Sequence, residues 1–342
     1  MKLYCCPSCF GDIHLRRSFF VQFSHEIGVC SYCLSPDQPL LSPRELREQF
    51  ELLTGIYVRD PQGIGLIELL KSDWGMFSHE RMDIAHAKEL LSDVLDDGEL
   101  VRQRYRPSET AVSDNALQRW DDLRQELIHK NRYFPETEIN LSRLKRLFDY
   151  LLLPAAEVAT NWFRARIQTG ATTYPPVEMK SPPKHLASHG RANPAGIPYL
   201  YLASTPITAV SEIRPHTGED ACVASVRIPD GLKVIDLRHP KRSVSPFMLS
   251  DESEISMLRS DVEFLEKLGE ELTRPVLPRS AAFDYVPSQY LCEYVKVCGF
   301  DGVMYRSSVG DGVNLALFDP DVAEIGATVT QRVGRVTVNF AE

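Results

Sequence analysis

The sequence predicts an α+β protein made of three consecutive parts. Paired cysteines mark a zinc-binding segment over residues 1–37, and a helical spacing of apolar residues marks a helical domain over 38–155. Short runs rich in β-branched and aromatic residues then predict a mixed β-sheet domain over 156–342. The change from helical to alternating periodicity near residue 160 separates the last two parts.

Four of the eight cysteines form two short pairs, Cys6–Cys9 and Cys30–Cys33, each with two residues between the thiols. Two such knuckles separated by a loop are typical of tetrahedral zinc. Cys5 is adjacent and could replace Cys6 at the cost of a wider loop. A closed four-cysteine site leaves no open coordination position, so the expected Zn²⁺ is structural.

Bulk composition excludes several classes of function. The chain of 342 residues carries a formal net charge of −9, which disfavours a nucleic-acid partner. No stretch approaches the roughly 18 apolar residues that a membrane span requires, so no membrane partner is expected. The N-terminal MKLYCCP is too polar for a secretory signal peptide. Metal-binding or free cysteines are typical of a reducing compartment, so the expected location is the cytoplasm.

The helical domain is predicted from its capping residues and apolar spacing. Ser42, Pro43 and Glu45 form a helix start in which Ser42 caps, Pro43 takes the first helical position and Glu45 completes a capping box. Gly55 ends this helix. The same apolar spacing predicts further helices near residues 84–95, 117–127 and 144–153.

The C-terminal half is predicted to be a largely antiparallel sheet interrupted by helices. Helices are expected near residues 253–272 and 287–298. Strands are expected at 162–167, 199–204, 222–228, 232–237, 302–307, 313–318 and 328–340.

Residues able to carry chemistry cluster along this half. Gly190-Arg191-Ala192-Asn193 precedes a strand that bears Tyr199 and Tyr201, and Glu212 follows eleven residues after Tyr201. The first strand carries Arg164 and Arg166, which share one face because strand side chains alternate. The run Tyr305-Arg306-Ser307-Ser308, followed by Asn314, comes after the last helix.

These motifs, in this order, resemble the RES domain, a family named for its arginine, glutamate and serine. The resemblance covers roughly residues 160–320, with Ala192 standing where the family usually has an aromatic residue. The zinc segment and helical domain are also similar to the N-terminal extension of one RES subfamily. The resemblance implies an ADP-ribosyltransferase-like fold and a toxin that cleaves NAD, with water or phosphate as the acceptor.

The residue types suit that chemistry. Cleavage of the nicotinamide–ribose bond passes through an oxocarbenium-like state, which the Glu212 carboxylate would stabilise. A guanidinium binds a diphosphate bidentately, and Arg164 and Arg191 are the candidates. Tyr201 would contact the nicotinamide side, and Ser307 or Ser308 a ribose hydroxyl or the carboxamide. The resemblance thus implies catalytic roles for Arg164, Arg191, Tyr201, Glu212 and Ser307, and NAD contacts from Arg166, Asn193, Tyr199, Ser308 and Asn314.

Several interpretations compete with these assignments. Tyr199 and Tyr201 alternate with leucines, so one of them is expected only to pack. Arg166 could equally form a structural ion pair. The leading function implies an antitoxin or inhibitory protein partner, because unrestrained NAD loss would harm the cell. A homo-oligomer is the commonest assembly for a soluble chain.

Three other functions remain compatible with the sequence. One is ADP-ribosyl transfer to a macromolecule, which often needs a second carboxylate; Glu219 and Asp220 follow Glu212 by more than a helical turn. A second is a non-catalytic module whose zinc segment recruits a partner. A third is RNA cleavage of the HEPN type, since His86 and His129 each follow an arginine, Arg81 and Arg124, with four residues between.

Overall fold

The computed structural model describes residues 3–108, 116–277 and 279–337, apart from the side chains of 116–118. The chain divides into two compact units, each described by itself below. One unit comprises Met1–Leu117 and Lys241–Leu265, and the other comprises Gln118–Pro240 and Glu266–Glu342. Helix α10 (Glu252–Thr273) therefore contributes to both units. The boundaries that the sequence predicts between the zinc-binding segment, the helical domain and the sheet domain, at residues 37 and 155, stay a prediction.

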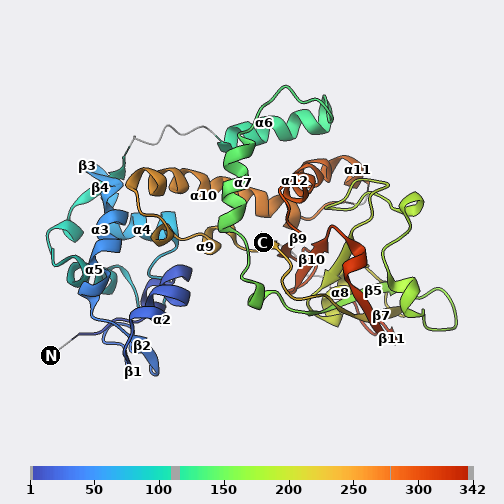
Figure 1. Ribbon diagram of the computed structural model, residues 1–342, viewed down its shortest axis with the longest axis horizontal. Coiled ribbons are helices and arrows are strands. Elements are labelled where there is room, and N and C mark those ends of the chain that lie inside the picture. The colour runs from blue at the N-terminus through green and yellow to red at the C-terminus, as the bar shows by residue number, and fades with distance from the viewer. Residues whose placement is uncertain (1–2, 109–115, 278, 338–342) are drawn as a thin grey trace. The chain divides into compact units, whose positions relative to one another are not determined.

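The first unit holds the two cysteine knuckles, two small hairpins and three longer helices (Figure 1). The capping box of Ser42 and Glu45 is present and opens a short 3-10 turn that leads into α3. The pairing of β3 with β4 adds a hairpin to the segment expected to be helical. The elements are α1 (Pro7–Phe10), α2 (Phe20–Phe23), β1 (Glu26–Gly28), β2 (Gln38–Leu40), α3 (Arg47–Gly55), β3 (Tyr57–Gly65), α4 (Leu66–Trp74), α5 (Ile84–Leu95), β4 (Arg104–Pro107) and α9 (Pro240–Ser243).

An aromatic core joins the first cysteine knuckle to the helices of this unit. Phe10, one residue beyond Cys9, packs with ring centroids 5.4 Å from Phe50 and 6.0 Å from Phe77. The ring centroid of Phe50 in turn lies 5.0 Å from that of Phe247, which belongs to the second stretch of chain in this unit, Lys241–Leu265. The knuckle is therefore anchored by apolar burial as well as by its thiols.

The second unit is built on a seven-stranded sheet with the order β11-β7-β5-β6-β10-β9-β8. Every neighbouring pair is antiparallel except β8 and β9, which are parallel. The sheet lies in the right half of Figure 1. Its strands are β5 (Asn161–Ile167), β6 (Leu200–Ala203), β7 (Asp220–Arg227), β8 (Val234–Asp236), β9 (Gly302–Arg306), β10 (Val313–Leu317) and β11 (Glu324–Arg332).

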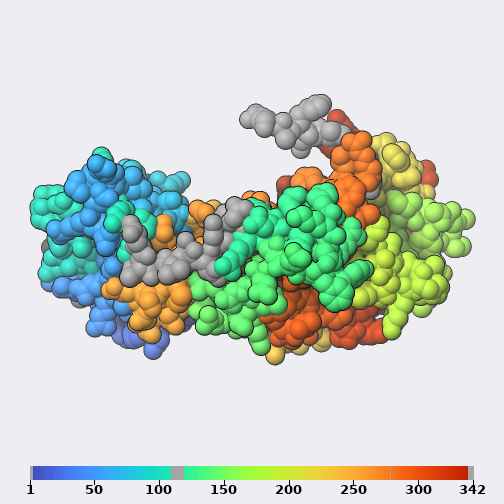
Figure 2. Space-filling model, turned by 90° about the horizontal axis from the view of Figure 1, so that it is seen from above, coloured from blue at the N-terminus to red at the C-terminus, as the bar shows by residue number. Residues whose placement is uncertain are grey.

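Several helices of this unit pack against the sheet or against one another. Helix α8 (Pro206–Glu212) packs on β5, β6 and β7, and α12 (Val286–Val297) packs on β9. Helices α6 (Ala116–His129) and α7 (Leu141–Tyr150) lie beside the C-terminal segments, as the green and orange regions of Figure 2 show. Phe148 of α7 makes this contact, with ring centroids 6.0 Å from Tyr294 and 6.2 Å from Phe300. The short α11 (Ala281–Asp284) precedes α12.

The predicted α+β class is confirmed, with the mixed sheet in the C-terminal half. The final strand is shorter than expected: β11 ends at Arg332, residues 333–337 are not in a strand, and 338–340 lie outside the described residues. The alternating pattern continues past Arg332, but β7, the strand that pairs with β11, starts at Asp220 opposite that residue. None of the helices in the described part of the chain has the length and apolarity that a membrane span needs.

Candidate functional site

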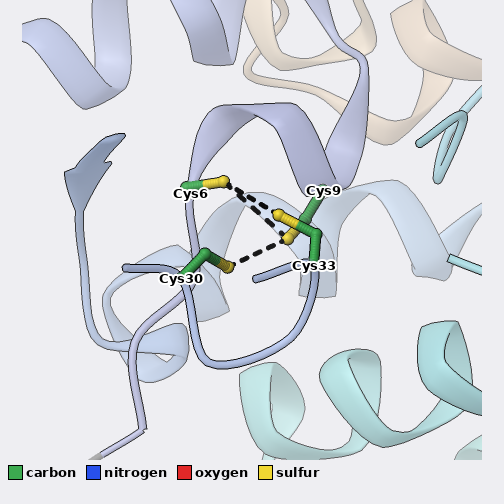
Figure 3. Close-up of side chains that lie close together, drawn as sticks. All are labelled: Cys6, Cys9, Cys30 and Cys33. Atoms are coloured by element: carbon green, nitrogen blue, oxygen red, sulfur yellow. Dashed lines mark hydrogen bonds between the residues drawn. The ribbon is translucent and has the colours of Figure 1, made fainter. Parts of the chain in front are cut away.

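The four knuckle cysteines converge in the first unit (Figure 3). Their sulfur atoms all lie within 4.8 Å of one another and all four residues are buried. The Sγ of Cys6 is 4.0 Å from that of Cys9 and 3.4 Å from that of Cys33, and Cys9 is 3.4 Å from Cys30. Four thiolates around a tetrahedral Zn²⁺ at about 2.3 Å are separated by nearly the same distances. The group could hold a metal ion.

The neighbouring Cys5 is turned away from this cluster. Its thiol donates to the carbonyl oxygen of Leu41 at 3.5 Å, and its backbone forms a bridge with the same residue. Cys6 rather than Cys5 therefore completes the four-thiol group, as the two-residue spacing predicts. The left-handed backbone of Gly11 ends α1 immediately after the first knuckle.

The second unit has a cavity of about 370 Å³ at the middle of its sheet. Strands β5 and β6 pair only at Phe163 and Ala203, so they separate beyond that point. Asn314 lies opposite Ala203 on one side and Tyr305 on the other, which places residues of three adjacent strands in one row. Helix α8 contributes Ala209 and Glu212 to the wall of this cavity. Of the predicted residues, the cavity is lined by Arg164, Arg191, Tyr201, Glu212 and Asn314.

Tyr201 holds the loop that follows Gly190. Its hydroxyl accepts from the backbone N–H of Ala192 at 2.9 Å and of Asn193 at 3.2 Å, and donates to Asn193 Oδ1 at 2.7 Å. Burial raises the pKa of Tyr201 well above its ordinary value, so the phenol stays protonated. A Cβ on Gly190 would lie 2.4 Å from Asn193 Oδ1 and 2.5 Å from the Tyr201 hydroxyl. Only glycine fits this close approach.

Asn193 is buried within the same loop and serves its backbone. Its Nδ2 lies within hydrogen-bond distance of three carbonyl oxygens, those of Ser188, Pro194 and Ile197, at 2.9–3.0 Å. The tyrosine and the asparagine therefore determine the shape of the loop that carries Arg191.

Glu212 is the last residue of α8 and is held by two buried donors. Ser307 Oγ donates to Glu212 Oε1 at 2.7 Å, and Asn314 Nδ2 donates to the same oxygen at 2.6 Å. Helix α8 is capped at its N-terminus by Thr205, whose Oγ1 accepts from the N–H of Thr208 at 3.1 Å. Ser307 lies outside the cavity lining but reaches it through this carboxylate.

The loop after β9 approaches α8 closely. A Cβ on Gly312 would lie 2.0 Å from Thr208 Oγ1, so glycine is required at this contact. The N–H of Ser307 donates to the carbonyl of Gly312 at 2.9 Å, which closes the loop. This closure positions the serine beside Glu212.

The two arginines of β5 have different surroundings. Arg164 Nη1 donates to the carbonyl of Tyr201 at 3.0 Å, at the point where β5 and β6 have separated. Burial, followed by the nearby charge of Arg166, lowers the pKa of Arg164 to about 10, so it remains charged at neutral pH. Arg166 Nη2 donates to the carbonyl of Lys180 at 2.6 Å and does not line the cavity.

Arg191 is held on three sides. Its Nη1 donates to the carbonyl of Arg274 at 2.7 Å, its Nη2 contacts Ser308 Oγ at 3.3 Å, and its guanidinium lies 5.3 Å from the Tyr285 ring centroid. The two candidate serines thus have separate partners: Ser307 bonds the glutamate and Ser308 contacts the arginine.

Tyr199 packs away from the cavity. Its ring centroid lies 5.0 Å from that of Phe318, Lys296 Nζ lies 5.1 Å above its ring, and only 2% of the residue is exposed. Sequence alternation left open which of the two tyrosines packs. In the structure Tyr201 lines the cavity and Tyr199 belongs to the core.

Other residues of the site were given no role by the sequence patterns. His189, Arg214, Tyr285 and Tyr305 line the cavity. The buried Ser288 and Gln289 of α12 hold the Gly190 loop: Ser288 Oγ donates to the carbonyl of Arg191 at 2.6 Å, and Gln289 Nε2 donates to that of Gly190 at 2.8 Å. Two adjacent polar residues on a buried helix face were the only available hint.

The arginine–histidine pairs have local partners. Arg124 forms an ion pair with Glu271 at 2.9 Å, and His86 bonds the helix cap Asp83 at 2.8 Å. His86 and Arg124 thus both have structural partners. Arg81 lies before the start of α5, so it does not share a helix face with His86.

Comparison with known proteins gives one family match. The model of the RES domain family matches residues 161–338, just over half of the chain. A chain of the M. tuberculosis MbcT–MbcA toxin–antitoxin complex is similar at 14% sequence identity and a TM-score of 0.32, over 55% of this chain and 92% of that chain. No curated protein sequence matches the chain.

Proposed function

The chain belongs to the RES domain family, and from this premise we propose that it is an enzyme that cleaves the nicotinamide–ribose bond of NAD. The observation that carries the proposal is the arrangement at Glu212, where Ser307 and Asn314 both donate to one carboxylate oxygen at the wall of an arginine-lined cavity. A carboxylate with fixed orientation in a cationic cavity suits a ligand that combines a diphosphate with a ribose.

The chemistry assigned to Glu212 is electrostatic. As the bond breaks, its electron pair leaves with neutral nicotinamide and positive charge develops on the ribose ring. The carboxylate, already oriented by its two donors, stabilises that charge without reorganising. An oxygen of water or of inorganic phosphate then bonds to the anomeric carbon, and for water the released proton passes to solvent. Tyr201 and Asn193 shape the loop that carries Arg191 beside this centre.

The family resemblance implies that such an activity serves as a toxin. Loss of NAD would stop the growth of the cell that makes the enzyme, so we propose that an antitoxin or inhibitory protein restrains it. Expression of the wild-type chain without such a partner is expected to arrest growth, and expression of a catalytically inactive variant is not.

The first test is NAD consumption by the purified chain and by Glu212→Gln. The glutamine keeps the shape but removes the charge, and we expect the turnover rate to fall by about 10²–10³-fold, as for loss of one preorganised electrostatic group. The measurement is chromatographic quantification of NAD, nicotinamide and ADP-ribose products with and without inorganic phosphate. The exposed Glu178→Gln serves as the matched control.

The outcomes separate the alternatives. Release of ADP-ribose or of its 1-phosphate identifies the acceptor. Nicotinamide release that appears only with added macromolecule would favour ADP-ribosyl transfer instead. A folded, metal-loaded wild-type chain that leaves NAD intact, or a Glu212→Gln variant as active as wild type, would overturn the proposal.

We also propose that the ion held by Cys6, Cys9, Cys30 and Cys33 is Zn²⁺. Four buried sulfur ligands leave no position for water or substrate, and this donor set is characteristic of structural zinc. The ion would stabilise the N-terminal fold and takes no part in NAD cleavage.

A further inference from the structure

The cavity at the sheet centre is strongly cationic. Its lining residues include three arginines and one histidine, but Glu212 is the only carboxylate among them. The chain as a whole has a net charge of −9, so the local excess of positive charge in the cavity is opposite in sign to the charge of the whole chain. A cavity of this charge favours an anionic ligand over a neutral one.

Two of the three guanidinium groups are already committed to the protein. Arg164 donates to the Tyr201 carbonyl, and Arg191 is held by the Arg274 carbonyl, Ser308 and the ring of Tyr285. These contacts orient both side chains but use part of their donor capacity. The third guanidinium, that of Arg214, is held less firmly by the protein.

The backbone of Arg214 is in an unfavourable conformation. Arg214 directly follows the last turn of α8, where Ile213 is the cap, and its N–H donates to the carbonyl of Ser211 at 3.1 Å. Its φ of 49° lies in the left-handed region, which glycine normally occupies at this position after a helix. Strained residues of this kind concentrate at functional sites.

The side chain of Arg214 is exposed and has donors to spare. Within the described residues the guanidinium donates from Nη2 to the Val276 carbonyl at 3.5 Å, the outer limit of such a contact. A guanidinium carries five N–H donors, so this contact leaves most of those on Arg214 for a ligand or solvent. Arg191 and Arg214 reach carbonyls only two residues apart on the same segment, Arg274–Val276.

We propose that Arg214 binds the diphosphate of NAD, an inference that rests on the proposed function and names the group that anchors its substrate. In NAD the diphosphate is attached to the 5′ carbon of the same ribose whose C1′ bond breaks. A diphosphate anchor must therefore lie about one ribose away from the carboxylate at C1′. Arg214 follows Glu212 by two residues and lines the same cavity. Its planar fork matches phosphate oxygens bidentately.

The test compares Arg214→Gly with Arg335→Gly, a change at an exposed arginine of an irregular segment that does not line the cavity. Glycine relieves the left-handed backbone, so the Arg214→Gly variant should unfold at the same temperature as wild type or higher. Binding of ADP-ribose, which keeps the diphosphate but has no bond to cleave, is measured by calorimetry. We expect its affinity to fall at least tenfold in Arg214→Gly and to stay unchanged in Arg335→Gly.

Two further probes identify the group that Arg214 contacts. Nicotinamide riboside lacks the diphosphate, so its kcat/KM should be equal in wild type and Arg214→Gly while that for NAD falls. Inorganic phosphate separates the substrate diphosphate from the acceptor. If the variant loses dependence on inorganic phosphate but keeps its affinity for ADP-ribose, Arg214 binds the acceptor and the inference is wrong.

Failure of this inference is distinguishable from failure of the proposed function. A wild-type chain that cleaves NAD, together with an Arg214→Gly variant of equal ADP-ribose affinity, overturns the role of Arg214 alone. A wild-type chain that binds ADP-ribose through Arg214 but leaves NAD intact supports the anchor and overturns the cleavage. A wild-type chain without affinity for ADP-ribose overturns the anchor.

Discussion

The lack of a side chain at Gly190 makes room for the loop that carries Arg191. The loop can approach β6 because nothing projects from this residue toward the hydroxyl of Tyr201 and the amide of Asn193. Gln289 binds the carbonyl of the same glycine, so its backbone is held from the other side as well. The glycine that opens the family motif is therefore a packing requirement of the loop rather than a contact to substrate.

We expect Gly190→Ala to destabilise the second unit by about 1–3 kcal/mol, the usual cost of forcing extra volume into a packed site. NAD cleavage should fall too, because the displaced loop carries Arg191. The measurement is chemical denaturation alongside the NAD assay. Gly170→Ala is the control, since its Cβ would meet nothing closer than Gln168 Nε2 at 3.9 Å. Equal stability of the two variants would contradict the close-approach argument.

The end of helix α10 links helix α6 to the loop that carries Arg191 through buried charges. Glu271 forms ion pairs with Arg124 of α6 at 2.9 Å and with Arg274 at 3.4 Å, and its side chain is only 2% exposed. Arg274 Nη2 also donates to the carbonyl of Asp284 at 2.7 Å. The carbonyl of Arg274 is the one that holds Arg191. These charges therefore position the segment that holds the Arg191 loop.

Glu271→Ala should be destabilising by about 3 kcal/mol, because it removes the buried partner of two arginines that are themselves only partly exposed. Glu270→Ala is the matched control: its neighbour Lys267 is 3.9 Å away and the glutamate side chain is 61% exposed, so a change within about 0.5 kcal/mol is expected. Urea unfolding of both variants measures the difference. A Glu271→Ala chain as stable as the control would show that the ion pairs contribute nothing.

Taken as a whole, the chain leaves one compact unit and returns to it. Residues 241–265 come after four strands of the seven-stranded sheet in sequence but belong to the unit that holds the four knuckle cysteines. There Arg259 pairs with Asp73 at 2.5 Å, and Ser245 donates to the buried Asp12 at 3.0 Å. The first unit is therefore assembled from two separated pieces of chain, with the proposed zinc site in the first piece.

Loss of the metal should destabilise the first unit most. We expect Cys6→Ser to abolish stoichiometric zinc and to increase amide hydrogen exchange over α1 and β1, because metal binding contributes folding free energy there. Cys5→Ser keeps all four ligands and should retain one zinc per chain. Elemental analysis and exchange mass spectrometry test both variants. Full zinc content in Cys6→Ser, or its loss in Cys5→Ser, would refute the ligand set.

Local patterns in the sequence were sufficient for the α+β class, the two cysteine knuckles and the motif that leads to Glu212. Those features depend on spacing along a few residues: thiols two apart in a turn, alternation in a strand, a cap before a helix. The resemblance to the family motif indicated the arginine, glutamate and serine positions because each part of the motif is likewise a short local pattern.

Long-range contacts decided what those patterns left open. Ser307 and Ser308 are adjacent in sequence but have different partners. Because the β9–β10 loop packs against α8, Ser307 hydrogen-bonds to Glu212, and Ser308 contacts Arg191. Nothing in the sequence distinguishes Arg214 from other arginines. Its left-handed backbone and the contacts that hold Arg164 and Arg191 are visible only in the structure. The placement of residues 241–265 had no local signal either. Contacts between residues far apart in sequence depend on the whole fold, because they form only when separately specified elements pack together.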